Sequence, residues 1–205
     1  MGYYTTASGE YSTAMGDSTI ASGYCSTAMG SFYTTASGNT STAIGLGTTA
    51  SGDASTAMGD STNAWGYGST AIGYSTAAWG YISTAMGHGS SASGAYSTAM
   101  GLGTNAYSYG SLALGRNNVV SYASGGDTQW IETDPVLEIG NGADRETPSN
   151  AVTILKNGEL RAAGVIQSKA GVRVPPLGDL SMGEFTSGSN PADLDPTLGL
   201  RYPTE

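Results

Sequence analysis

The chain has 205 residues, with 16 acidic and 7 basic side chains and a formal net charge of −9. An acidic chain without a basic patch is a poor partner for phosphate backbones or anionic lipids, so this composition argues against nucleic-acid binding. No apolar run approaches the roughly 20 residues that cross a bilayer, so we expect no membrane insertion by this chain.

Lysine, arginine and proline divide the chain. Residues 1–115 contain none of the three, whereas every basic residue, starting at Arg116, and every proline, starting at Pro135, lies in the remainder. Together with the repeats described next, this predicts three regions. They are a repetitive head at residues 1–116, a β-rich neck or stem at 117–174, and an extended Pro- and Gly-rich tail at 175–205.

A five-residue phrase, Ser-Thr-Ala-Met-Gly at residues 12–16, returns almost unchanged through the first region. Its glycine recurs at Gly16, Gly30, Gly45, Gly59, Gly73, Gly87, Gly101 and Gly115. The steps are 14 residues except for one of 15, which an extra residue near Phe32 and Tyr33 causes. A looser phrase, Thr-Ala-Ser-Gly at residues 6–9, recurs midway. A fixed short period over more than half of a chain is typical of a solenoid, in which each repeat packs on its neighbours.

Each half-repeat holds about 7 residues. This is too short for a helix and a turn, and a glycine in every half-repeat would weaken a helix. A strand of four or five residues followed by a short turn fits the length, with glycines at the sharp bends. The sequence therefore predicts an all-β fold, a parallel β-solenoid of 14-residue coils that each contain two strands.

Side chains on a strand alternate between two faces, so each repeat position forms a column along the solenoid. Alanines such as Ala14 should fill the coil interior, while Thr13 and Met15 share the outward face. The outward apolar column is Met15, Met29, Ile44, Met58, Ile72, Met86, Met100 and Leu114. Such a stripe marks an interface, and an alanine-lined coil buries little surface by itself. We therefore expect an obligate oligomer with this column as its interface.

The phrases Ser-Thr-Ala-Met-Gly and Ser-Thr-Ala-Ile-Gly, alternating with Thr-Ala-Ser-Gly at a period of 14, resemble the head repeats of YadA-like trimeric autotransporter adhesins. The resemblance covers roughly residues 5–115 and includes the repeat phase, the alanine column and the apolar column. It implies a left-handed parallel β-roll that assembles as a homotrimer on a bacterial surface. The sequence departs from the common family pattern by using Thr and Met where Val and Ile are more usual.

Short strands are expected after the repeats. Residues 129–131 and 136–139 are predicted strands divided by Asp134 and Pro135, and Asn157-Gly158 predicts a hairpin near residues 151–161. Residues 136–161 resemble segments of phage tail-fibre-like and bacterial surface-fibre proteins. In such proteins a trimeric stem often precedes a C-terminal trimerisation or chaperone module.

The repeats offer no catalytic or metal-binding constellation. His88, the one histidine, lies in a predicted turn, so neither a histidine-based triad nor a multi-histidine metal site is available within one chain. Asp17, Asp53 and Asp60 also lie in predicted turns, where aspartate is favoured for backbone reasons. We therefore predict no enzyme activity, no catalytic residue, no metal and no cofactor.

Aromatic residues interrupt the repeat in two consecutive coils. They are Trp65, Tyr67, Tyr74, Trp79 and Tyr81. The two tryptophans occupy a slot that is serine in the first coils, and an indole cannot replace serine inside a thin coil, so both should face outward. The cluster is either a ligand-binding strip, since rigid aromatics form binding hot spots and stack on sugars, or a filler between neighbouring subunits.

These patterns predict a non-enzymatic trimeric fibre or adhesin head, outside the cell, that presents a rigid solenoid to a host or surface receptor, protein or glycan. A phage or virion tail fibre is the close alternative, favoured by residues 136–161. Ice binding is an alternative from another class, since threonine ranks on a flat solenoid order water, but here the threonine column shares its face with Met and Ile. A purely structural spacer is the third alternative.

Overall fold

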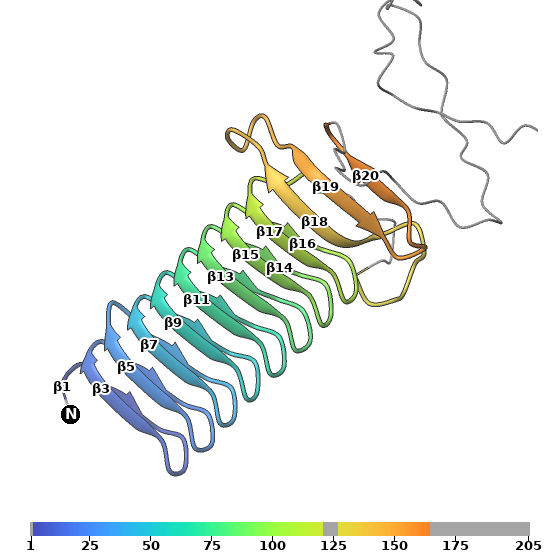
Figure 1. The fold of residues 1–205 in the computed structure, drawn as a ribbon. Helices are drawn as coiled ribbons and strands as arrows, with labels where there is room; N and C mark the ends of the chain where they lie inside the picture. Colours follow the sequence, from blue (N-terminus) through green and yellow to red (C-terminus); the bar gives the residue numbers. More distant parts are fainter. Residues whose placement is uncertain (1, 121–126, 165–205) are drawn as a thin grey trace, which may run out of the picture. The chain divides into compact units, whose positions relative to one another are not determined.

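A computed structural model of the chain describes residues 2–120 and 127–164. Within these residues the protein is all-β, and the repeats form a parallel β-solenoid whose coils stack along one axis (Figure 1). Each coil contributes one strand to each of two sheets. We call these the long-strand sheet and the short-strand sheet. The long-to-short turn connects a long strand to the short strand that follows it, and the short-to-long turn connects a short strand to the next long strand.

The two sheets run in chain order along the solenoid. The long strands are β1 (Gly2–Tyr3), β3 (Thr13–Asp17), β5 (Thr27–Ser31), β7 (Thr42–Leu46), β9 (Thr56–Asp60), β11 (Thr70–Tyr74), β13 (Thr84–His88), β15 (Thr98–Leu102) and β17 (Leu112–Arg116). The short strands are β2 (Thr6–Ala7), β4 (Ile20–Ala21), β6 (Thr35–Ala36), β8 (Thr49–Ala50), β10 (Asn63–Ala64), β12 (Ala77–Ala78), β14 (Ser91–Ala92) and β16 (Asn105–Ala106).

Equivalent residues of successive coils pair without offset, as the 14-residue period predicts. Ala57 pairs with Ala71, and Met58 with Ile72. The second strand is shorter than expected, with two residues instead of four or five. The chain bends directly after it, because the amides of Trp65 and Gly66 both donate to the carbonyl of Ala78, at 2.8 and 3.3 Å.

The alanine-lined interior is confirmed. From Ala21 to Ala113, the alanines of both columns have no exposed surface. Two columns of hydroxyl side chains share this interior. One lies two residues before the alanines of the long strands and includes Ser26 and Ser41. The other precedes the short strands and consists of Thr19, Thr34, Thr48, Thr62, Thr76, Ser90 and Thr104. Some tie one coil to the next, since the Oγ1 of Thr34 donates to the carbonyl of Gly45 at 2.9 Å.

The repeated glycine of the long strands lies within the strand, whereas we expected it at a bend. Gly59, in β9, has φ +127°, and a Cβ added there would overlap the carbonyl oxygen of Gly73 in the next coil. The same relation holds for Gly45 and Gly59. The column is therefore glycine for two reasons, the positive φ and the close approach of the backbones of neighbouring coils at this position.

This contact gives a test of the coil spacing. We expect Gly59→Ala to prevent folding or to lower the free energy of unfolding by about 3 kcal/mol or more, since the new methyl group has no space. The matched control is Gly110→Ala, at φ +64° with nothing within 4 Å, which should cost about 1 kcal/mol through its backbone conformation alone. Urea unfolding followed by circular dichroism measures both, and equal losses would contradict the close-approach explanation.

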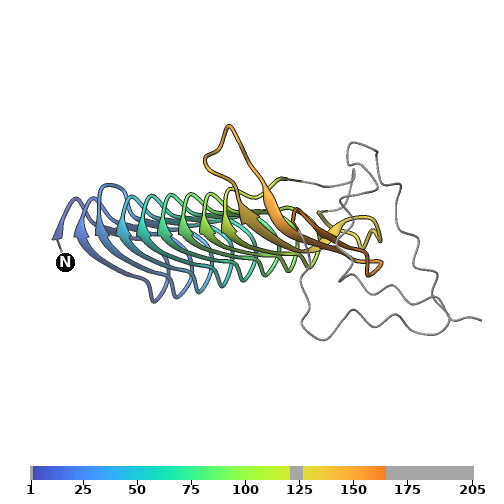
Figure 2. The same cartoon turned by 45° about the horizontal axis from the view of Figure 1, so that its top comes forward.

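The long-strand sheet continues beyond the repeats into β18 (Pro135–Asn141). This strand pairs in parallel with β17, so that Leu137 lies opposite Leu112 and Ile139 opposite Leu114. Antiparallel strands β19 (Asn150–Leu155) and β20 (Leu160–Ala162) extend the sheet, and the loop between β18 and β19 projects from it (Figure 2). The boundary near residue 116 stays a prediction, and the sheet itself runs across it.

The strand expected at residues 129–131 is wrong, because Gln129 lies in a bend and Trp130 and Ile131 have no regular secondary structure. Its Trp130 is exposed, and the centroid of its ring lies 5.0 Å from the ammonium group of Lys156 in a cation–π arrangement. The ammonium group also lies 4.0 Å from the carboxylate of Asp134. The end of the expected neck and the expected tail at 175–205 lie outside the described residues.

A buried carboxyl group closes the alanine column. Glu138 lies opposite Ala113 in the sheet and is only 3% exposed. The Nδ2 groups of Asn118 and Asn150 donate to it, at 3.0 and 3.1 Å. Burial raises its pKa from an ordinary 4.5 to about 7, although both amide donors act to lower that pKa. The folded protein therefore binds a proton here at a pH where the unfolded chain has lost it.

The raised pKa sets a pH dependence of stability. Between pH 4.5 and 7 the folded state holds more protons than the unfolded state, so the free energy of unfolding falls as the pH rises through this window. We expect Glu138→Gln to remove this part of the slope, worth about 3 kcal/mol at most. Urea unfolding at several pH values measures it, with the exposed Glu132→Gln as control. A wild-type slope retained by Glu138→Gln would contradict the assignment.

Candidate binding surfaces

The outward face of the long-strand sheet carries the predicted apolar column. Met15, Met58 and Met100 are 39%, 38% and 42% exposed, and the column's remaining members are half-buried. The threonine column runs beside it on the same face, paired Thr56 to Thr70. All of these side chains lie outside the coil, so the interior of a single solenoid does not cover them.

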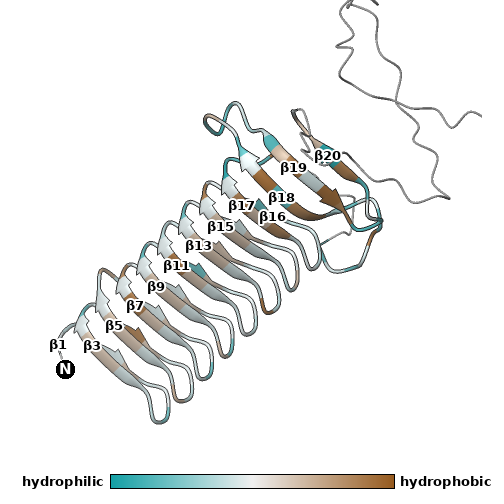
Figure 3. Cartoon of the chain, in the orientation of Figure 1, coloured by the Kyte–Doolittle hydropathy of each residue, from teal (hydrophilic) through white to brown (hydrophobic). Residues whose placement is uncertain are grey.

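This face becomes more aliphatic toward its C-terminal end. Residues that pair directly across a sheet point to the same side, so Ile139 and Val152 continue the face that carries Leu114. Leu137 and Ile154 likewise continue the position of Leu112. Figure 3 shows the corresponding hydrophobic colour on β18 and β19. The apolar column predicted from the repeats ends at Leu114 and does not include this extension.

Four of the five predicted aromatic residues lie along one side of two coils. Trp65 and Trp79 face outward next to the short strands, with Trp79 52% exposed and the ring centroids 3.5 Å apart at an interplanar angle of 61°. Tyr67 and Tyr81 follow in the short-to-long turns, stacked at 5.3 Å and 10°. Tyr74 does not join them. It ends β11 at the opposite edge of the coil.

Tyr74 instead stacks on His88, with ring centroids 4.9 Å apart and an interplanar angle of 3°. Both rings are exposed and occupy equivalent positions of neighbouring coils. Stacking on a neighbour is a structural use of these side chains. It accounts for His88 without a metal or a catalytic partner.

The tyrosine row extends further than the sequence indicated. Tyr96 lies 5.4 Å from Tyr81 and 5.3 Å from Tyr109, ring centroid to ring centroid. Tyr67, Tyr81, Tyr96 and Tyr109 therefore form a continuous row along the short-to-long turns of four coils. Tyr96 and Tyr109 were both missed, because Ala95 interrupts the tyrosines at the first turn position and Tyr96 occupies the second. Comparing both turn positions coil by coil would have found them.

The turn positions expected for Asp17, Asp60 and His88 are wrong, because these residues end the long strands β3, β9 and β13, whereas Asp53 does lie in a turn. The carboxylates of Asp17 and Asp60 accept hydrogen bonds from Ser18 and Ser61, at 3.1 and 2.7 Å, and Asp53 accepts from the amide of Asn39 at 2.8 Å. No group of three or more His, Cys, Asp or Glu side chains suited to a metal ion occurs in residues 2–120 and 127–164. In the same part of the chain, no helix is long and apolar enough to span a membrane.

Comparison with known proteins identifies the repeats. The family model of the YadA head domain repeat, which spans two copies, matches the chain at residues 2–32, 36–62, 50–76, 80–104 and 92–118. These matches cover the solenoid and more than half of the chain. A search of curated protein sequences gave no match. The matched family is a non-enzymatic structural domain of surface-exposed adhesins.

Proposed function

The chain belongs to the YadA head domain repeat family, and from this we propose that it is the head of a trimeric adhesin. Three copies associate through the outward face of the long-strand sheet, each as a left-handed β-roll. The opposite side, with its exposed aromatic side chains, presents the receptor-binding surface outside the cell. The resemblance of residues 136–161 to tail-fibre segments keeps a phage or virion fibre as the close variant, since the family matches end at residue 118.

Self-association is supported by the location of the large apolar side chains, which lie outside the coil and not in its interior. The interior of each coil holds Ala, Ser and Thr, whereas Met, Ile and Leu lie outside it in one straight column. A contiguous apolar stripe on a surface marks an interface. Burial of these side chains supplies apolar area that the narrow coil lacks. A second and a third copy carry the same column in the same spacing, so the faces match along their length.

Charges placed in the column test this interface. We expect Met58→Asp combined with Ile72→Asp to give a monomer, because three copies would bring six carboxylates into an apolar contact. The control is Ser37→Asp combined with Ser51→Asp, two exposed positions beside the short strands. Sedimentation equilibrium should give three times the 20.6 kDa chain mass for wild type and control. A monomeric wild type, or a trimeric Met58/Ile72 variant, would contradict the proposed interface.

The aromatic strip formed by Trp65, Trp79, Tyr67 and Tyr81 is the proposed receptor contact. Its rings lie on the side of the coil away from the apolar column, and Trp79 remains 52% exposed. Large rigid rings that are held against each other before binding lose little conformational freedom on contact with a receptor. The rival role, a filler between subunits, predicts instead that removal of the rings weakens the trimer.

One double variant separates the two roles. We expect Trp65→Ala combined with Trp79→Ala to abolish adhesion of cells that display the protein, while sedimentation still shows a trimer. Tyr74→Ala, at the opposite edge, is the control and should leave adhesion unchanged. Undiminished adhesion removes the tryptophans from the receptor site. Loss of the trimer assigns them to packing between subunits.

A further inference from the structure

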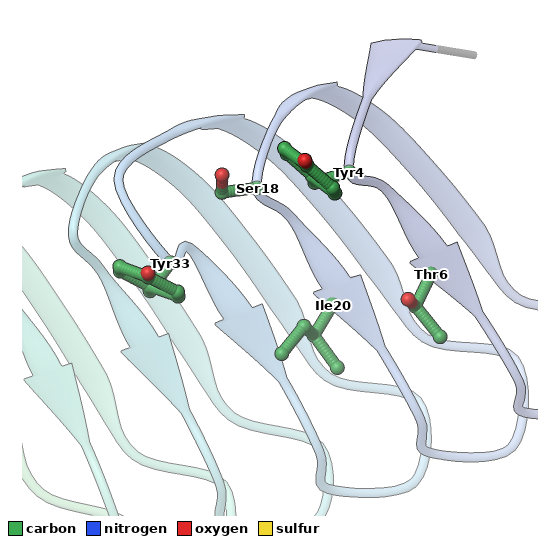
Figure 4. A pocket seen from close by; sticks show the side chains of 5 residues that line it. All are labelled: Tyr4, Thr6, Ser18, Ile20 and Tyr33. Atoms are coloured by element: carbon green, nitrogen blue, oxygen red, sulfur yellow. The ribbon is translucent and has the colours of Figure 1, made fainter.

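A hollow of about 300 Å³ lies over the first three coils, away from the aromatic strip. Its lining is Tyr4, Thr6, Ser18, Ile20 and Tyr33 (Figure 4). Figure 4 shows the two phenol rings on either side of Ser18, with Ile20 and Thr6 on the neighbouring short strands. We infer that this hollow binds one ring of a neutral saccharide between Tyr4 and Tyr33.

The walls stand in a backbone conformation that bulky residues avoid. Each long-to-short turn contains a residue with positive φ: Tyr4, Ser18, Phe32, Gly47, Ser61, Ser75, Gly89, Gly103 and Asn117. Gly, Ser and Asn are the small residues that suit such turns, whereas aromatic residues are disfavoured there. Aromatic residues occur in the two turns that flank the hollow. Bulky residues also take positive φ in the short-to-long turns, as Tyr11, Ile82 and Tyr96 do, so what distinguishes the two flanking turns is their aromatic side chains on this edge of the solenoid.

The single irregular step of the repeat builds one of the walls. The coil that contains Phe32 and Tyr33 has the extra residue, and both of these residues have positive φ, 53° and 62°. Hydrogen bonds fix the enlarged turn. The Oγ1 of Thr34 shares its one hydrogen between the carbonyls of Ser31 and Gly45, each at 2.9 Å, and the Oγ1 of Thr35 donates to the carbonyl of Tyr33 at 2.8 Å. The insertion therefore makes an ordered projection, with the Tyr33 side chain 73% exposed at its end.

The opposite wall is also supported. The ring of Tyr4, likewise 73% exposed, packs against the ring of Tyr3, with centroids 4.1 Å apart at 65°. Tyr4 and Tyr33 belong to turns two coils apart, which corresponds to roughly 10 Å at the usual strand spacing. Ser18, in the coil between them, is small enough to leave that space open. A saccharide ring fits between two walls at this separation.

The chemistry of the lining matches a sugar. Ile20 is the one large aliphatic side chain among the first residues of the short strands, and it pairs with Thr6 and Thr35. The floor of the hollow therefore combines an apolar patch with hydroxyl groups. The hydroxyls of Tyr4, Thr6 and Tyr33 can both donate and accept, as sugar hydroxyls do, whereas the hydroxyl of Ser18 donates to Asp17 and is left to accept. A saccharide ring offers C–H groups to the aromatic and aliphatic surfaces. None of the lining side chains carries a formal charge, which favours a neutral ligand.

A peptide is a poorer fit. Beside the hollow, β4 pairs on both sides, while β2 ends the short-strand sheet but has only two residues, so the edge on which a peptide strand could add is very short. A proline-rich segment is the remaining peptide ligand, because such segments dock on aromatic-lined grooves. The lining has no acidic or basic side chain that would fix the direction of a peptide. Binding of a polyproline peptide is therefore measured alongside that of the saccharides.

The test uses the full chain and saturation-transfer NMR with the methyl glycosides of glucose, galactose, mannose and N-acetylglucosamine. We expect at least one to bind and Tyr33→Gly to weaken that binding at least about fivefold, by loss of one stacking surface. Glycine suits the positive φ, so this variant should fold as well as wild type. Tyr33→Phe keeps the ring and should retain binding.

The matched control is Tyr11→Gly, which removes a tyrosine that is also 73% exposed, at φ 58°, in the short-to-long turn of the first coil. It should leave binding unchanged. The inference is wrong if no glycoside of the panel binds, or if binding is the same in Tyr33→Gly as in wild type. Binding of a polyproline peptide that depends on Tyr33, without saccharide binding, would also overturn it.

Discussion

The structure depends on the contact between the backbones of successive coils. The glycine of each long strand lies against the carbonyl group of the equivalent glycine one coil later, as Gly59 does with Gly73. The interior between the two sheets is narrow enough for Ala, Ser and Thr only. Main-chain pairing and these small side chains hold each coil to the next. An offset of one residue would turn every inward alanine outward, so the contact fixes both spacing and register.

The narrow interior determines where the larger side chains go. Methionine, isoleucine, tryptophan and tyrosine do not fit inside a coil, so they occupy the outer faces and the turns. The position in the repeat then decides the surface that each one joins. Met58 and its equivalents form the stripe on the long-strand sheet, while Trp65 and Trp79 lie on the other side. One architectural limit thus gives two different surfaces, the proposed contact with other copies and the proposed receptor contact.

The sequence predicted the features that follow from the period alone. The solenoid, the buried alanine columns and the outward position of Trp79 each require only the phase of the repeat and the alternation along a strand. Features that depend on spacing outside the period were missed. In β18, Leu137 and Ile139 pair with the apolar positions of β17 as another repeat would. However, 18 residues separate the two strands instead of the usual short connection, so the periodicity of the sequence did not reveal β18. The hollow at Tyr4 and Tyr33 depends on backbone angles in turns, which composition does not specify.

The uniform register makes the coil a unit of length. Adding or deleting 14 residues changes the reach of the solenoid by about 4.8 Å and leaves every remaining contact of the same kind. Tandem duplication of the underlying gene segment can therefore lengthen or shorten the protein without the invention of a new core. The extra residue at Phe32 and Tyr33 illustrates the complementary freedom, since a turn accepts an insertion while the strands on both sides keep their pairing. Length and decoration can thus evolve independently on the same scaffold.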